Sequence, residues 1–149
     1  MSGGNAIAAV LSASAGLAAA VQVAIFGRFG DKVGTLPAFA FSCVITAVIA
    51  TGILVIGQRT VGGFATAWQA PKWLWIGGVL GAFIVLSITI AAPRIGTFAT
   101  VALIIAGQLT ISTIIDRFGL FGLQQVPFTP YRVAGIILLA VGALLALKR

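Results

Sequence analysis

The sequence has no histidine, a single cysteine (Cys43) and only two acidic residues, Asp31 and Asp116. Without histidine, and with so few other ligands, a zinc site cannot be built and a Ser/His/Asp triad has no base. Two lone aspartates do not supply the paired carboxylates of a glycosidase. Cys43 has no partner for an intrachain disulfide. We therefore expect neither an enzyme nor a protein with a metal or cofactor.

Charge is also scarce, at 7% of 149 residues, while 60% of the residues are hydrophobic. Soluble domains average about 25% charged residues, so this is the composition of an integral membrane protein. The formal net charge is +7, but the basic residues are scattered singly at the ends of hydrophobic stretches. They form no basic stripe that could follow a phosphate backbone. We expect contact with membrane lipid, not nucleic acid, and a multi-pass location in a membrane.

Five stretches are long enough to cross a bilayer as helices, which requires about 20 apolar residues each. They are apolar on every face, unlike the alternating strands of a membrane β-barrel. The predicted spans of this single five-helix domain, residues 1–149, are 5–26, 36–56, 72–91, 97–115 and 131–147. Residues 28–32 are expected to form a polar turn and residues 58–69 a connection. Residues 92–96, which include Pro93, are expected to form a tight break between the third and fourth spans, because proline cannot continue the helical hydrogen bonding.

Lysine and arginine divide almost evenly between the two sides of the membrane. Counted by alternate loops, five lie on one side and four on the other: Arg28, Lys32, Arg94, Lys148 and Arg149 against Arg59, Lys72, Arg117 and Arg132. The positive-inside bias that normally fixes orientation is therefore nearly absent. Such a chain can insert both ways up, and opposed copies can pair as inverted repeats do within one transporter. The expected fold is an all-α membrane protein of five transmembrane helices, half of an inverted-repeat transporter completed by antiparallel dimerisation.

Polar side chains inside the spans are the candidates for chemistry, because lipid offers them no hydrogen-bond partner. Serine and threonine usually bond back to their own helix. Glutamine does so less readily, so Gln22 and Gln108 either bond each other across helices or line a polar cavity. Gln108, Ser112 and Asp116 are spaced by four residues and share one helix face.

Asp116 lies at the end of the fourth span, where we expect an ion pair with a basic residue or a role in ion coupling. The adjacent Arg117 points about 100° away on a helix and is a poor partner. Arg28 and Arg94 are the other charged candidates, either snorkelling to the headgroups or attracting anions. No acidic residue lies deep in a span, which disfavours proton-coupled export of organic cations and leaves neutral or anionic solutes, or passive exchange, open.

Small residues in the third and fifth spans predict tight helix packing. The residues concerned are Gly77, Gly81, Gly135 and Gly142. They serve either as a dimer seam or as ordinary packing within one bundle. An aromatic belt is expected at one interface, formed by Trp68, Trp73 and Trp75.

Three segments resemble the YdcZ-type family, a five-span branch of the drug/metabolite transporter superfamily. They are residues 20–30, 71–81 and, most specifically, 107–122, and residues 132–135 resemble the start of the family's last span. The resemblance covers nearly the whole chain. It implies a five-helix half-transporter in a bacterial inner (plasma) membrane that acts as an antiparallel dimer, with a central site lined by the first four spans. Phe26 stands where the family tends to have asparagine, and Arg117 where histidine is common.

The predicted function is transport of a small organic solute by alternating access of an antiparallel homodimer. The candidate substrate-binding residues are Gln22, Phe26, Ser42, Trp75, Gln108 and Ser112. Two alternatives stay open: a small dual-topology ion channel, and a subunit of a heterodimeric transporter. A dedicated subunit should have a clear charge bias of its own, which this chain lacks.

Overall fold

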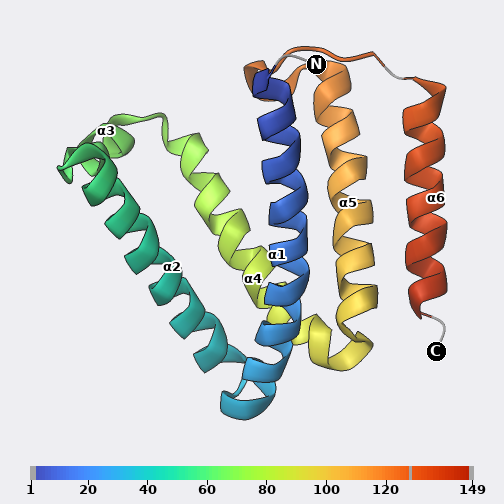
Figure 1. Cartoon of the computed structure of the whole chain (residues 1–149), viewed down its shortest axis with the longest axis horizontal. Coiled ribbons are helices and arrows are strands. Elements are labelled where there is room, and N and C mark those ends of the chain that lie inside the picture. Colours follow the sequence, from blue (N-terminus) through green and yellow to red (C-terminus); the bar gives the residue numbers. More distant parts are fainter. Residues whose placement is uncertain (1–2, 128, 148–149) are drawn as a thin grey trace. The chain divides into compact units, whose positions relative to one another are not determined.

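The computed structural model describes residues 3–127 and 129–147, and among them there are helices but no strands. Five helices are long and apolar enough to cross a membrane, as the sequence predicted. They are α1 (Gly3–Val33), α2 (Thr35–Gln58), α4 (Ile76–Ile95), α5 (Thr97–Phe118) and α6 (Pro130–Leu147). Figure 1 shows their order along the chain. Lys148 and Arg149, counted above among the charges, lie outside the described residues.

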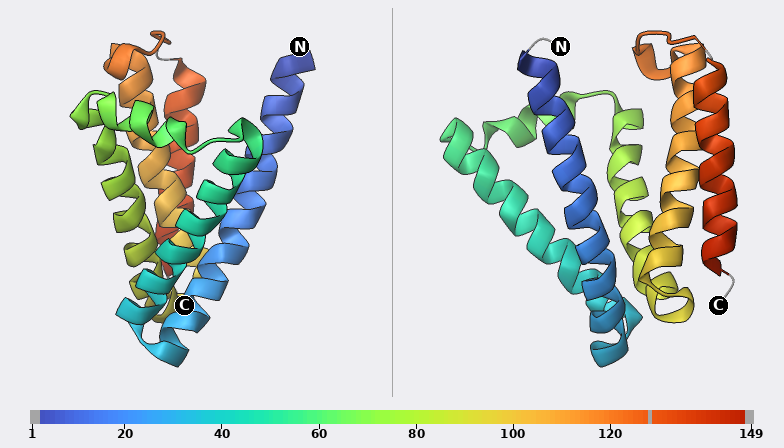
Figure 2. Two further views of the ribbon diagram at one scale, coloured as in Figure 1. Left: turned by 90° about the vertical axis from the view of Figure 1, so that its left-hand side faces the viewer. Right: turned by 45° about the vertical axis from the view of Figure 1, so that its right-hand side comes forward.

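The helices form two compact units. One contains α1 as far as Val23 together with α5 and α6, and the other contains the rest of α1 together with α2, α3 (Gly62–Gln69) and α4 as far as Pro93. Within the first unit, α5 and α6 lie side by side and run antiparallel (Figures 1 and 2). A 3-10 turn, η1 (Lys72–Trp75), precedes α4, and another, η2 (Leu120–Gly122), follows α5.

The α1–α2 and α4–α5 connections use the same local sequence and the same backbone geometry. Residues 32–36 read Lys-Val-Gly-Thr-Leu and residues 94–98 read Arg-Ile-Gly-Thr-Phe. Gly34 has φ 90° and ψ 153°, and Gly96 has φ 84° and ψ 158°. Only glycine adopts this region without strain. Each new helix begins at the following threonine, so these two glycines set the helix ends.

Two predicted helix ends are therefore wrong. Residues 28–32, expected to form a polar turn, continue α1 to Val33, and Pro93, expected to break the chain, lies inside α4. Pro93 has no N–H to donate to the carbonyl of Thr89 one turn earlier. In the second unit, α1 packs closely there, and a Cβ on Gly30 would lie 3.4 Å from that carbonyl oxygen. The connection 58–69 also contains α3, a short helix that the sequence did not predict.

The close approach of α1 and α4 in the second unit depends on glycine. A Cβ on Gly27 would lie 3.1 Å from the Cβ of Ala92, and one on Gly30 would lie 3.0 Å from Cγ2 of Thr89. Thr89 is 1% exposed and Ala92 6% exposed. The Thr89 hydroxyl donates to the carbonyl of Val85 at 2.9 Å. The contact is thus fully packed and its polar group is satisfied.

Replacing Gly30 by alanine tests this packing. The new methyl group would meet Thr89 Cγ2 at 3.0 Å, so we expect destabilisation by roughly 1–3 kcal/mol, offset by up to about 1 kcal/mol of helix propensity. The measurement is the unfolding midpoint of the protein in detergent. Gly16→Ala is the matched control on the same helix, because nothing lies within 4 Å of a Cβ there.

Adding Thr89→Ser to Gly30→Ala removes the clashing methyl group and keeps the hydroxyl. We expect this double variant to recover part of the lost stability. Equal midpoints for the Gly30 and Gly16 variants would contradict the close contact.

Candidate functional site

Most hydroxyl groups inside the spans are satisfied by their own helix. Each donates to a carbonyl oxygen three or four residues earlier: Ser12, Ser14, Ser42, Thr46, Thr89, Thr100, Thr110 and Thr113. This is the usual behaviour of serine and threonine in helices. Ser42, a predicted substrate-binding residue, is 7% exposed and donates to Ala38 at 2.7 Å. Its hydroxyl is therefore already hydrogen-bonded within its own helix.

Gln22, Gln108 and Ser112 differ from these hydroxyl-bearing residues. Their side chains are exposed and make no hydrogen bond with any residue that the structure describes. Gln22 and Gln108 thus do not bond each other within one chain. Gln108 and Ser112 lie one turn apart on α5, as their spacing predicted. Three polar side chains within spans are therefore open to partners outside the chain.

Asp116 near the end of α5 forms an ion pair with Arg132 in the first turn of α6. Arg132 Nη1 donates to Asp116 Oδ2 at 2.9 Å. The intervening loop folds back onto α5, because the N–H of Val126 donates to the main-chain carbonyl of Asp116 at 2.8 Å. An ion pair for Asp116 was expected, but its partner, Arg132, was not among the candidates. Arg28 and Arg94 are exposed near the ends of α1 and α4.

A cavity of about 280 Å³ lies between α5 and α6 beside this ion pair. Its lining residues are Leu109, Ser112, Thr113, Asp116, Arg132, Gly135, Ile136 and Leu139. One end carries the charged pair and the two hydroxyl residues, and the remaining wall is apolar. The unpartnered hydroxyl of Ser112 and the guanidinium of Arg132 therefore share one small space.

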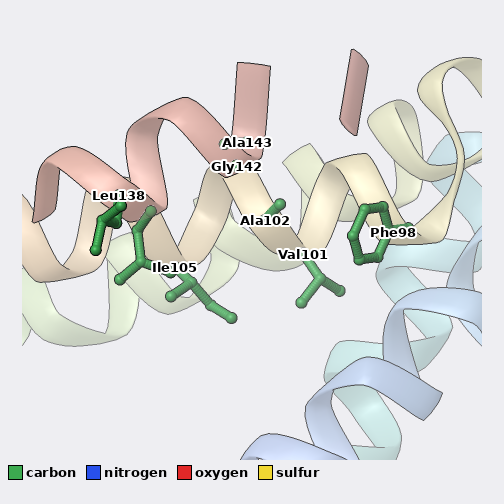
Figure 3. Close-up of a pocket in the computed structure, with 8 residues that line it drawn as sticks. Phe98, Val101, Ala102, Ile105, Leu138, Gly142 and Ala143 are labelled. Carbon is green, nitrogen blue, oxygen red and sulfur yellow. The ribbon is translucent and has the colours of Figure 1, made fainter. Parts of the chain in front are cut away.

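A second hollow, of about 270 Å³, lies farther along the same helix pair and is entirely apolar (Figure 3). Its lining residues are Phe98, Val101, Ala102, Ile105, Leu138, Leu139, Gly142 and Ala143. Leu139 lines both hollows, so they are neighbours. The α5–α6 pair thus offers a polar hollow at one end and an apolar hollow next to it.

The four glycines predicted to pack helices tightly have no close neighbour among the residues that the structure describes. A Cβ on Gly77, Gly81, Gly135 or Gly142 would meet nothing within 4 Å among the described residues. Gly135 and Gly142 instead leave space that becomes part of the two hollows. A dimer seam at Gly77 and Gly81 stays a prediction.

Aromatic residues of α3 and η1, which precede α4, form a separate cluster in the second unit. The rings of Trp68 and Trp75 have centroids 4.7 Å apart, and Trp75 Nε1 donates to the carbonyl of Ala67 at 3.4 Å. These three residues and Phe64 line a hollow of about 250 Å³. Trp75, a predicted substrate-binding residue, thus lies in the expected tryptophan cluster. Phe26, another, is half-buried on α1.

Five helices that are long and apolar enough to cross a membrane, with polar side chains among them, are typical of a small multi-pass membrane protein. Residues 7–145 match the family described as "Putative inner membrane exporter, YdcZ", and the chain belongs to this family. It is 29% identical to the inner membrane protein YdcZ of Escherichia coli (strain K12) over 138 residues, which cover 91% of each chain. No solved structure matches the chain. The predicted family and inner-membrane location are confirmed.

Replacing Gln108 by alanine separates a cavity role from a structural one. Because the amide has no partner within the described chain, we expect the free energy of unfolding to change by less than about 0.5 kcal/mol. We expect transport to fall by roughly two- to tenfold through loss of one hydrogen bond. The measurements are the unfolding midpoint in detergent and solute exchange in vesicles.

The matched control is Thr110→Ala on the same helix, where the hydroxyl is bonded to Ala106 at 2.8 Å. This control should leave transport unchanged. A large fall in the midpoint of the Gln108 variant would make that amide part of the structural framework.

Proposed function

We propose that this chain is half of a transporter and that two copies, inserted in opposite orientations, move a small organic solute by alternating access. The observation that carries the proposal is the set of open polar side chains, Gln22, Gln108 and Ser112, inside helices that span the membrane. A polar group facing hydrocarbon without a partner costs several kcal/mol. A second copy that packs around these side chains removes them from hydrocarbon, and they then line a polar cavity between the two copies.

The even division of charge supports opposed copies rather than parallel ones. Five basic residues lie on one side and four on the other, so neither orientation is strongly favoured. Five spans also place the two ends of the chain on opposite sides of the membrane. A pair related by a two-fold axis in the membrane plane brings the same residues of both copies to one central site.

This symmetry also supplies the transport cycle. In an antiparallel homodimer, the inward-open and outward-open states are the same structure turned over. They are equal in energy when the solutions on the two sides match. The direction of transport then comes from solute gradients, because a ligand shifts an equilibrium only through its different affinities for the two states. Rocking of one half against the other is the established means of alternating access in inverted-repeat transporters.

Trapping one orientation tests the proposal. Two lysines inserted after Gly62 raise the number of basic residues on that side from four to six, against five on the other. We expect most copies to insert one way and transport by this variant alone to be lost. The readout is exchange of a radiolabelled solute, chosen by screening on the wild-type protein, across vesicle membranes. If unlabelled solute on the far side of the membrane speeds the exchange of labelled solute, the protein is a carrier rather than a channel.

The matched control adds two lysines after Arg149, on the opposite side. This variant should also be inactive alone, and co-expression of the two variants should restore exchange because they supply opposed copies. Full activity of either variant with a single measured orientation would refute the antiparallel pair.

A further inference from the structure

We propose that the polar cavity between α5 and α6 binds the carboxylate group of a small organic anion. Arg132 is the binding cation, and Asp116 is an internal carboxylate that occupies Arg132 until the ligand arrives. This assignment names a substrate class for the transporter and rests on the transport function for its meaning. Binding itself can be measured without transport.

Arg132 has unused capacity for a carboxylate. Its guanidinium makes one hydrogen bond to Asp116, from Nη1 to Oδ2, and no other with the part of the chain that the structure describes. A guanidinium carries five N–H donors arranged to hold a carboxylate through two parallel bonds. With 41% of its side chain exposed, Arg132 can offer a ligand the two-bond geometry that Asp116 does not use.

Displacing Asp116 costs little. Its side chain is 36% exposed, so water can solvate the carboxylate once it leaves Arg132. Exposed ion pairs of this kind change an equilibrium constant by about fivefold or less. An incoming carboxylate that forms two charge-assisted bonds therefore competes successfully with the internal one.

The cavity matches a small acid in size and lining. Its volume of about 280 Å³ is roughly twice that of an engineered cavity of about 150 Å³ that holds benzene. Ser112 adds a hydroxyl with no partner among the described residues, and Leu109, Ile136 and Leu139 supply apolar walls. A carboxylate attached to one ring fits this combination.

Local charge favours an anion over a cation. The end of the α5–α6 pair carries Arg117 and Arg132 but a single acid, Asp116. The whole chain has a formal charge of +7. A cationic ligand would have to bind Asp116 while two guanidinium groups repel it, whereas an anion meets a net positive field.

Binding of radiolabelled benzoate to the detergent-purified protein, measured by equilibrium dialysis, tests the assignment. We expect saturable binding, with neutral benzamide competing at least about tenfold more weakly because it lacks the charge. Arg132→Gln should weaken benzoate binding at least about tenfold. Arg132→Lys should retain part of it, because the charge stays while the two-bond geometry is lost.

Asp116→Asn is the decisive variant. Removing the internal competitor should tighten benzoate binding by about two- to fivefold, a gain that misfolding cannot produce. The matched control is Arg117→Gln, which removes a neighbouring positive charge that does not line the cavity and should weaken benzoate binding far less than Arg132→Gln does.

Weaker benzoate binding by Asp116→Asn would overturn the proposal and make the ion pair a structural clamp. Tighter binding of benzylammonium than of benzoate, lost in Asp116→Asn, would overturn it in favour of a cation site. Benzoate binding without any exchange across vesicles would support this site while counting against the transport function. Exchange of other solutes without benzoate binding would support the transport function and overturn the carboxylate site.

Discussion

The energetic cost of an unbonded polar group in hydrocarbon governs how this chain uses its few polar residues. Hydroxyl groups such as those of Ser42 and Thr89 bond to their own helices. Asp116 reaches an arginine at the membrane edge. The amides of Gln22 and Gln108 find no partner among the described residues, so their partners must come from a second copy, a solute or enclosed water. The proposed second copy would enclose these amides in a polar cavity and so remove the cost of leaving them in hydrocarbon.

Local features of the backbone position the candidate site between α5 and α6. A glycine corner at Gly96 starts α5, and the loop after α5 is held by the hydrogen bond between Val126 and Asp116. This loop returns the chain so that α6 runs antiparallel to α5, bringing Arg132 within 2.9 Å of Asp116. Small residues along α6 then leave room between the helices rather than closing it. The result is a charged end and an apolar hollow on one helix pair.

The five helices could be predicted from sequence because runs of about 20 apolar residues leave few other structures in a membrane. Their ends were harder to place, since Pro93 is accommodated within α4 while Gly34 and Gly96 turn the chain. The eight residues of α3 were missed because so short a helix has little periodicity to read. Arg132 was missed as the partner of Asp116 because the two are 16 residues apart, and only the folded loop brings them together. The only indication in the sequence was that Asp116 and Arg132 were expected on the same side of the membrane.

The orientation of the chain in the membrane tests the central claim most directly. A single cysteine placed at the C-terminal end, with Cys43 replaced, can be labelled from each side of the membrane in intact cells and in opened ones. The antiparallel homodimer predicts that about half of the copies are labelled from each side, because the charges nearly balance. Labelling of all copies from one side would contradict it and would require a different, oppositely oriented partner chain.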